Sequence, residues 1–131
     1  MKVASALVVD TSSWISYFSG QCKQEEEIDL ALKEGRVFLS PLVAAELLSA
    51  RLKSHEKEKL INFLSNLPLC ASSLDHWIRV GELRAELLSK GLKVSTPDTH
   101  IAQCCLDLNC YLLTEDKIFI HIAKSVSLKL L

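Results

Sequence analysis

Residues 5–12 read S-A-L-V-V-D-T-S. The run of small and apolar residues at 5–9 is typical of a strand buried inside a sheet, and it ends at Asp10, which two hydroxyl residues follow. Asp10 could simply cap the helix that starts after it. It could also lie at the carboxyl end of a parallel strand, where α/β proteins bind their ligands. The rest of the chain has to decide between these two interpretations.

Strand-like and helix-like segments alternate along the chain, without an internal repeat or a low-complexity linker. This alternation predicts a single α/β domain over residues 1–131 with a central, mainly parallel sheet. Ser40-Pro41 and Thr96-Pro97 each place a hydroxyl residue before a proline, which is a common start of a helix. The expected strands span 5–9, 36–39, 69–71, 110–113 and 126–130. The expected helices run from 12 to near Gly20 and over 24–34, 41–52, 55–66, 74–90, 97–108 and 116–124.

The composition narrows the class of protein. Hydrophobic residues make up 49% of the chain, enough for a sizeable core, but no apolar run approaches the roughly 18–20 residues of a membrane span. The apolar N-terminal stretch runs directly into Asp10 and lacks the pattern of a signal peptide, so we expect a cytoplasmic protein that does not associate with membranes. The formal net charge of −1 gives no general electrostatic attraction to nucleic acid, so such binding would need local patches or a metal.

The five cysteines are an odd number and include no C-x-x-C pair. We expect buried free thiols in a reducing compartment. Neither cysteine nor histidine recurs at the spacing of zinc ligands, which argues against a zinc site. His55 and His76 are expected at the surface, and His100 should point away from the face that carries Asp98. The cysteines are Cys22, Cys70, Cys104, Cys105 and Cys110.

Four acidic residues stand in unusual positions. Asp10 ends the first expected strand and Asp116 follows the strand 110–113, so both would share one crevice if these strands are neighbours. Glu46 lies mid-helix among apolar residues, where an unpaired carboxylate is costly, and Asp98 lies in the first turn of its helix. Taken singly, each has an ordinary explanation as a helix cap, a buried ion pair or a complement to the helix dipole. We call them together the acidic quartet: Asp10, Glu46, Asp98 and Asp116.

The acidic quartet would repel itself unless cations were present. A set of carboxylate oxygens suits Mg²⁺ or Mn²⁺ rather than Zn²⁺. The hydroxyls of Thr11, Ser12 and Thr114 are placed to orient these carboxylates or their waters. Metal ions held in this way can bind phosphate and activate water. A nucleic-acid substrate is therefore compatible with the negative net charge of the chain.

Four stretches carry a resemblance to a known family: V-V-D-T-S-S-W at 8–14, S-P-L-V-A-A-E-L at 40–47, G-L-K-V-S-T-P-D-T-H-I-A at 91–102 and L-L-T-E-D-K-I-F at 112–119. Their order and spacing resemble PIN-domain ribonucleases across essentially the full length, in particular the VapC-type toxins of toxin–antitoxin pairs. The resemblance implies a three-layer α/β/α sandwich and a Mg²⁺- or Mn²⁺-dependent endoribonuclease. It also implies that the acidic quartet is the catalytic, metal-holding set, and that the chain forms a homodimer inhibited by a small antitoxin protein.

One departure from the family pattern concerns the last stretch. Relatives often carry a further acid two residues after the first aspartate of this motif, where the chain has Ile118. The choice between one and two metals per site therefore stays open. Arg84 and Lys117 are candidate contacts for RNA phosphate, with an edge arginine packed along its stem and plain surface charge as the alternatives.

Other functions fit less well. A receiver domain that is phosphorylated needs adjacent acids after its first strand, whereas Thr11 follows Asp10. A phosphatase of the haloacid dehalogenase type needs a second aspartate where the chain has Ser12. A PIN-like fold that has lost catalysis and serves as a binding module stays open because of Ile118. We expect an endoribonuclease that leaves 5′-phosphate and 3′-hydroxyl ends.

Overall fold

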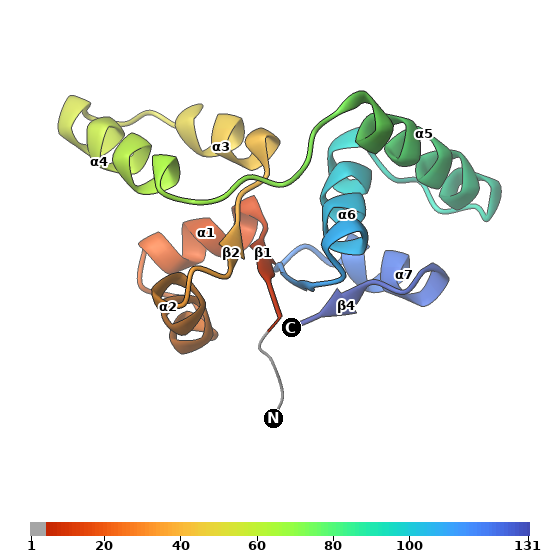
Figure 1. The fold of residues 1–131 in the computed structure, drawn as a ribbon, viewed down its shortest axis with the longest axis horizontal. Helices are drawn as coiled ribbons and strands as arrows, with labels where there is room; N and C mark the ends of the chain where they lie inside the picture. Colours follow the sequence, from red (N-terminus) through yellow and green to blue (C-terminus); the bar gives the residue numbers. More distant parts are fainter. Residues whose placement is uncertain (1–4) are drawn as a thin grey trace.

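A parallel sheet of four strands forms the centre of the molecule in the computed structural model, which describes residues 5–131 (Figure 1). The strand order is β2-β1-β3-β4, and all pairings are parallel. Val9 lies opposite Leu113, so the strands that end at Asp10 and before Asp116 are neighbours, which is the condition for the two acids to share one crevice. The strands are β1 (Leu7–Val9), β2 (Val37–Phe38), β3 (Tyr111–Leu113) and β4 (Lys129–Leu130).

Helices cover both faces of the sheet. Figure 1 shows α1 and α2 on one side of the sheet and α6 and α7 on the other. Helix α6 packs on β1 and β3, α7 packs on β4, and α5 lies along α6. The predicted α/β/α sandwich is therefore confirmed. The helices are α1 (Thr11–Phe18), α2 (Glu25–Lys33), α3 (Pro41–Leu48), α4 (Ser54–Ser65), α5 (Leu74–Ser89), α6 (Thr96–Leu108) and α7 (Ile118–Ser125).

The central position of β1 explains its uninterrupted apolar sequence. Its three residues are almost fully buried because strands flank it on both edges and helices cover both faces. Ser40 accepts a hydrogen bond from the Leu42 amide and caps α3, as the sequence predicted. For α6 the predicted cap is off by one residue: Ser95, not Thr96, accepts from the Asp98 amide at 3.1 Å. The carboxyl ends of β1 and β3 thus lie side by side, next to the starts of α3 and α6.

The strand predicted at 69–71 is wrong. Leu69 makes a single bridge to Leu39, and the Cys70 amide donates to the Leu39 carbonyl at 2.8 Å. Pro68 has no amide hydrogen to contribute to a ladder, and α5 begins at Leu74, so the segment has no room to pair further. The five cysteines are buried and free, as predicted. Within residues 5–131, no helix is long and apolar enough to cross a membrane.

Asn109 ends α6 in the left-handed region, with φ 49° and ψ 51°. Asparagine tolerates this conformation, whereas a β-branched side chain does not. We expect Asn109→Val to lower the free energy of unfolding by about 1–2 kcal/mol and Asn109→Gly to leave it nearly unchanged. Urea denaturation of the two variants checks this, and an equal loss in both would show that the asparagine side chain matters rather than its backbone angle.

Candidate active site

Asp10 lies at the carboxyl end of β1, in the N-cap position of α1. Its carboxylate is buried and makes no capping hydrogen bond to α1, all of which lies in the described part of the chain. Instead Oδ2 accepts from the Thr114 hydroxyl at 2.9 Å and from the Ser12 hydroxyl at 3.4 Å. The Asp10 amide donates to the Leu113 carbonyl, which continues the β1–β3 pairing. The chain therefore holds this carboxylate between two strand ends rather than using it as a cap.

Hydroxyl groups tie the two strand ends together and connect them to α3. The Thr11 hydroxyl donates to Glu46 Oε1 at 2.7 Å. The Thr114 hydroxyl, which donates to Asp10, also accepts from the Asp116 amide at 3.0 Å. The Ser12 hydroxyl accepts from the Glu115 amide at 3.0 Å. The three hydroxyls proposed to orient the acids are thus each within hydrogen-bond distance of a quartet residue.

The other members of the quartet differ in burial. Glu46 is exposed, so the expectation that it lies among apolar side chains is wrong; it sits on the solvent face of α3. Asp98 is half-buried at the start of α6. Asp116 is exposed, and its Oδ1 accepts from the Ile118 amide at 3.1 Å, so it also stabilises the start of α7.

Burial and neighbouring negative charge both raise the pKa of two quartet residues. Burial raises the pKa of Asp10, and the charges of Asp98 and Glu46 raise it further. Burial likewise raises the pKa of Asp98, with the charges of Asp116 and Glu46 adding to it. The quartet residues come from four different elements, and they lie close enough for their charges to disfavour the ionised forms of Asp10 and Asp98.

No lysine, arginine or histidine among residues 5–131 forms an ion pair with any member of the quartet. Among the same residues, the quartet is not one of the groups of three or more ligand atoms that lie close enough together to hold a metal ion. Mg²⁺ keeps several of its waters when protein carboxylates bind it, so it can be held through water without such a tight cluster. The donor set of carboxylates and hydroxyls matches that ion and offers no soft ligand.

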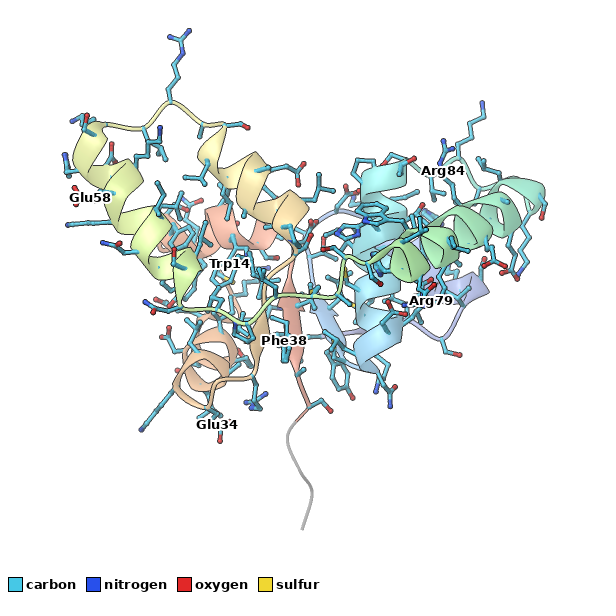
Figure 2. The ribbon with its side chains drawn as sticks, turned by 45° about the horizontal axis from the view of Figure 1, so that its top comes forward. Trp14, Glu34, Phe38, Glu58, Arg79 and Arg84 are labelled. Carbon is cyan, nitrogen blue, oxygen red and sulfur yellow. The ribbon has the colours of Figure 1, made fainter. Side chains whose placement is uncertain are left out.

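The two basic candidates, Arg84 and Lys117, come from different elements. Arg84 is half-buried on α5, and its Nε donates to the Val94 carbonyl at 3.0 Å, which anchors the loop before α6 (Figure 2). Lys117 is exposed at the start of α7, directly after Asp116. Arg84 therefore has a structural partner, and its remaining guanidinium nitrogens are the part left for a substrate contact.

Comparison with known proteins assigns the chain to a family. The family model described as PIN domain matches residues 7–125. The chain belongs to the PIN-domain family. Ribonuclease VapC2 from Rickettsia felis is 36% identical over 93 residues, covering 68% of this chain and 69% of that protein. The resemblance noted from the sequence is confirmed.

Solved structures agree with this assignment to the PIN-domain family. VapBC2 from Rickettsia felis, bound to a DNA fragment from their promoter, matches with a TM-score of 0.76 and 26% identity over 96% of this chain and 97% of that one. DNA-bound VapBC from Salmonella typhimurium matches with a TM-score of 0.76 over 97% of both chains. Its identity of 22% supports the fold alone.

One polar cluster of this PIN domain was missed in the sequence. His76 is fully buried, so its expected surface position is wrong, and it contacts His100 and Asp107. Burial and, to a smaller extent, the neighbouring His76 lower the pKa of His100 to about 4, which keeps the ring neutral at pH 7. The sequence held a sign of this cluster, because polar residues at 100, 103 and 107 follow one another at helical spacing on α6. His100 and Gln103 of this row are buried.

Proposed function

We propose that this PIN-domain chain is a divalent-metal-dependent endoribonuclease and the toxin of a toxin–antitoxin pair. The observation that carries the proposal is the acidic quartet: four carboxylates from four elements, gathered at the carboxyl edge of a parallel sheet without a cationic partner among the described residues. The similarity to Ribonuclease VapC2 makes RNA the expected substrate.

Each residue of the quartet has a proposed role. Asp10, Asp98 and Asp116 would hold Mg²⁺ or Mn²⁺, directly or through water, and Glu46 would be the remaining ligand or the base that positions the attacking water. The bound ion would neutralise phosphate charge and activate water. The Thr11 hydroxyl fixes Glu46, and the Thr114 hydroxyl fixes Asp10. Lys117 and the free part of Arg84 are proposed phosphate contacts.

Similar structures and one groove on the surface support a proposal for the protein partners of this chain. The similar structures include VapBC assemblies and a toxin–antitoxin complex from Klebsiella pneumoniae, so a small antitoxin is the expected partner. A groove of about 560 Å³ lies between α1 and α4, and we propose that it binds an amphipathic antitoxin segment. Its lining combines four apolar and three polar residues: Phe18, Leu52, Leu60, Phe63, His55, Glu56 and Lys59. The free thiols support a reducing, cytoplasmic location, and a homodimer remains part of the proposal.

RNA cleavage with controlled metal content tests the proposed function. The purified chain should cut end-labelled RNA with Mg²⁺ or Mn²⁺, lose this activity with EDTA and regain it when Mn²⁺ is added. The products should be ligatable 5′-phosphate ends. Asp116→Asn, purified in the same way, controls for contaminating nuclease and should be inactive.

Two results would contradict this proposal. Cleavage that persists in EDTA, or that leaves 2′,3′-cyclic phosphate, would show metal-independent chemistry. A wild-type chain that neither binds Mn²⁺ nor cuts RNA would support the alternative in which the fold is a binding module without catalysis.

A further inference from the structure

A chain of four polar side chains joins three helices next to the acidic quartet. Asp107 Oδ2 lies 2.8 Å from His76 Nδ1, and His76 Nε2 lies 2.7 Å from His100 Nδ1. His100 Nε2 lies 2.8 Å from the Ser40 hydroxyl. The two histidines and Ser40 are at most 1% exposed. We call this set the Asp107–Ser40 chain; it connects α5, α6 and the N-cap of α3.

The outer end of the chain is a fixed carboxylate. Although burial raises the pKa of Asp107, hydrogen bonds from Arg79, His76 and Gln103 hold it at about 2. Arg79 approaches with both Nε and Nη2 at 3.0 Å, and Gln103 Nε2 donates at 2.8 Å. Figure 2 shows Arg79 on α5 beside α6. Asp107 is therefore ionised at neutral pH and can only accept hydrogen bonds.

This carboxylate sets the direction of the first bond in the chain. Because Asp107 can only accept, His76 donates to it from Nδ1. The other two bonds join His76 Nε2 to His100 Nδ1 and His100 Nε2 to the Ser40 hydroxyl, and the tautomers of the two rings decide which atom donates. The Ser40 oxygen at the same time accepts from the Leu42 amide at 3.2 Å, which caps α3. The bonds run without a break from α5 through α6 to the start of α3, so the chain ties the three helices together.

The same histidines, together with Cys104, have ligand atoms within 4.8 Å of one another, which raises the question of a buried metal. The geometry is that of hydrogen bonds. Two nitrogens on a tetrahedral zinc would be about 3.3 Å apart, given Zn–N bonds of about 2.0–2.1 Å, whereas these are 2.7 Å apart. The ring centroids are 4.8 Å apart, so the nitrogens face each other instead of converging on a third point. Trp77 stacks on His100 at 4.6 Å and covers one of its faces.

The inner end of the chain lies beside the quartet. His100 follows Asp98 by two residues on α6, and Ser40 starts the helix that carries Glu46. Asp98 and Glu46 are therefore carried by the two helices that the chain joins. We propose that the Asp107–Ser40 chain positions Asp98 and Glu46 for metal binding by tying α6 to the start of α3. The inference rests on the proposed metal-dependent function and makes His76, His100 and Ser40 positioning residues.

Mn²⁺ affinity of chain variants tests this inference. His76→Leu and His100→Leu should each weaken Mn²⁺ binding about 10-fold, measured by titration calorimetry on the folded full chain. Saturating Mn²⁺ should restore most of the kcat for RNA. Ile28→Ala is the matched control, because Ile28 is fully buried on α2. It should lower the melting temperature comparably and leave the Mn²⁺ Kd within about twofold of wild type.

Two substitutions of Ser40 test the same inference if a leucine variant does not fold. Ser40→Ala should weaken Mn²⁺ binding, whereas Ser40→Thr, which keeps the hydroxyl, should retain it. Ser73→Ala removes the cap of α5 without removing a chain member, so it should keep wild-type affinity.

If the wild-type chain binds Mn²⁺ and the folded His76, His100 and Ser40 variants bind it with unchanged Kd, the positioning role is wrong. The proposed function is not affected by that result. The positioning role would also be wrong if the purified protein contained one zinc per chain and His76→Leu lost it, because the histidines would then be metal ligands. A wild-type chain without Mn²⁺ binding would overturn both this inference and the proposed function.

Discussion

Asp10→Asn should reduce RNA cleavage more than about 100-fold, because loss of even an indirect partner of a metal typically costs 10–100-fold. Asp10 is the most buried member of the quartet and is held by the Thr114 hydroxyl. Asparagine keeps the size and an acceptor oxygen for that hydroxyl but lacks the charge that binds a divalent ion. Single-turnover cleavage with saturating Mn²⁺ measures the effect, and full activity in this variant would refute the assignment of Asp10.

The same variant should be more stable than wild type when no metal is present, with a melting temperature about 2–4 °C higher. The folded-state pKa of Asp10 is raised above its unfolded value, so its ionised form destabilises the fold at pH 7. This destabilisation fades as the pH falls toward the folded-state pKa, and the difference between the proteins should shrink between pH 7 and pH 4.

Glu58→Gln is the matched control for this comparison, because it removes the same charge from an exposed position on α4 (Figure 2). It should change the melting temperature by no more than about 1 °C at any pH. A lower melting temperature for Asp10→Asn than for wild type would show that the carboxylate stabilises the fold instead of straining it.

Trp14→Ala should lower the free energy of unfolding by about 3–5 kcal/mol, which is a large part of the stability of a domain of this size. Trp14 is fully buried on α1. Its ring stacks on Phe18 and meets Phe63 edge-on, with ring centroids 5.5 Å apart in both cases. Figure 2 shows it between α1 and α4. Urea denaturation followed by circular dichroism gives the loss.

Trp14→Phe separates packing from polarity in this prediction. Among the described residues, Trp14 Nε1 and Ser13 Oγ are the buried side-chain polar atoms without a hydrogen-bond partner. Phenylalanine keeps most of the aromatic surface and removes the unpaired N–H, so the loss should be much smaller than for alanine. Equal losses in the two variants would mean that packing against Phe18 and Phe63 is not what Trp14 contributes.

Much of the fold could be predicted from local patterns. The apolar runs at 5–9 and 110–113 indicate central strands because burial on both faces excludes polar residues, and the structure pairs them. The hydroxyl-proline pairs locate the starts of α3 and α6 to within one residue, since capping depends only on neighbours in sequence. The segment 69–71 looks like a strand by composition, but strand formation also requires a partner with free backbone groups.

The candidate site was only partly predictable for a related reason. Sequence order could place acids at strand ends, but it could not tell which face of α3 would meet solvent, so the exposure of Glu46 was missed. The burial of His76 depends on α5 lying along α6, a contact between helices that no local pattern specifies. Polar residues on an inward helix face, such as His100 and Gln103, were the nearest available sign.

The separation in sequence between Asp10 and its partners has a consequence for biosynthesis. Asp10 is synthesised early, but the Thr114 hydroxyl that holds it lies 104 residues later, and Asp116 follows that. Because translation proceeds from the N-terminus, a growing polypeptide that already contains Asp10 lacks Thr114 until 104 further residues have been joined. The proposed metal site therefore stays incomplete on the ribosome throughout that synthesis, and the proposed nuclease is completed only after it.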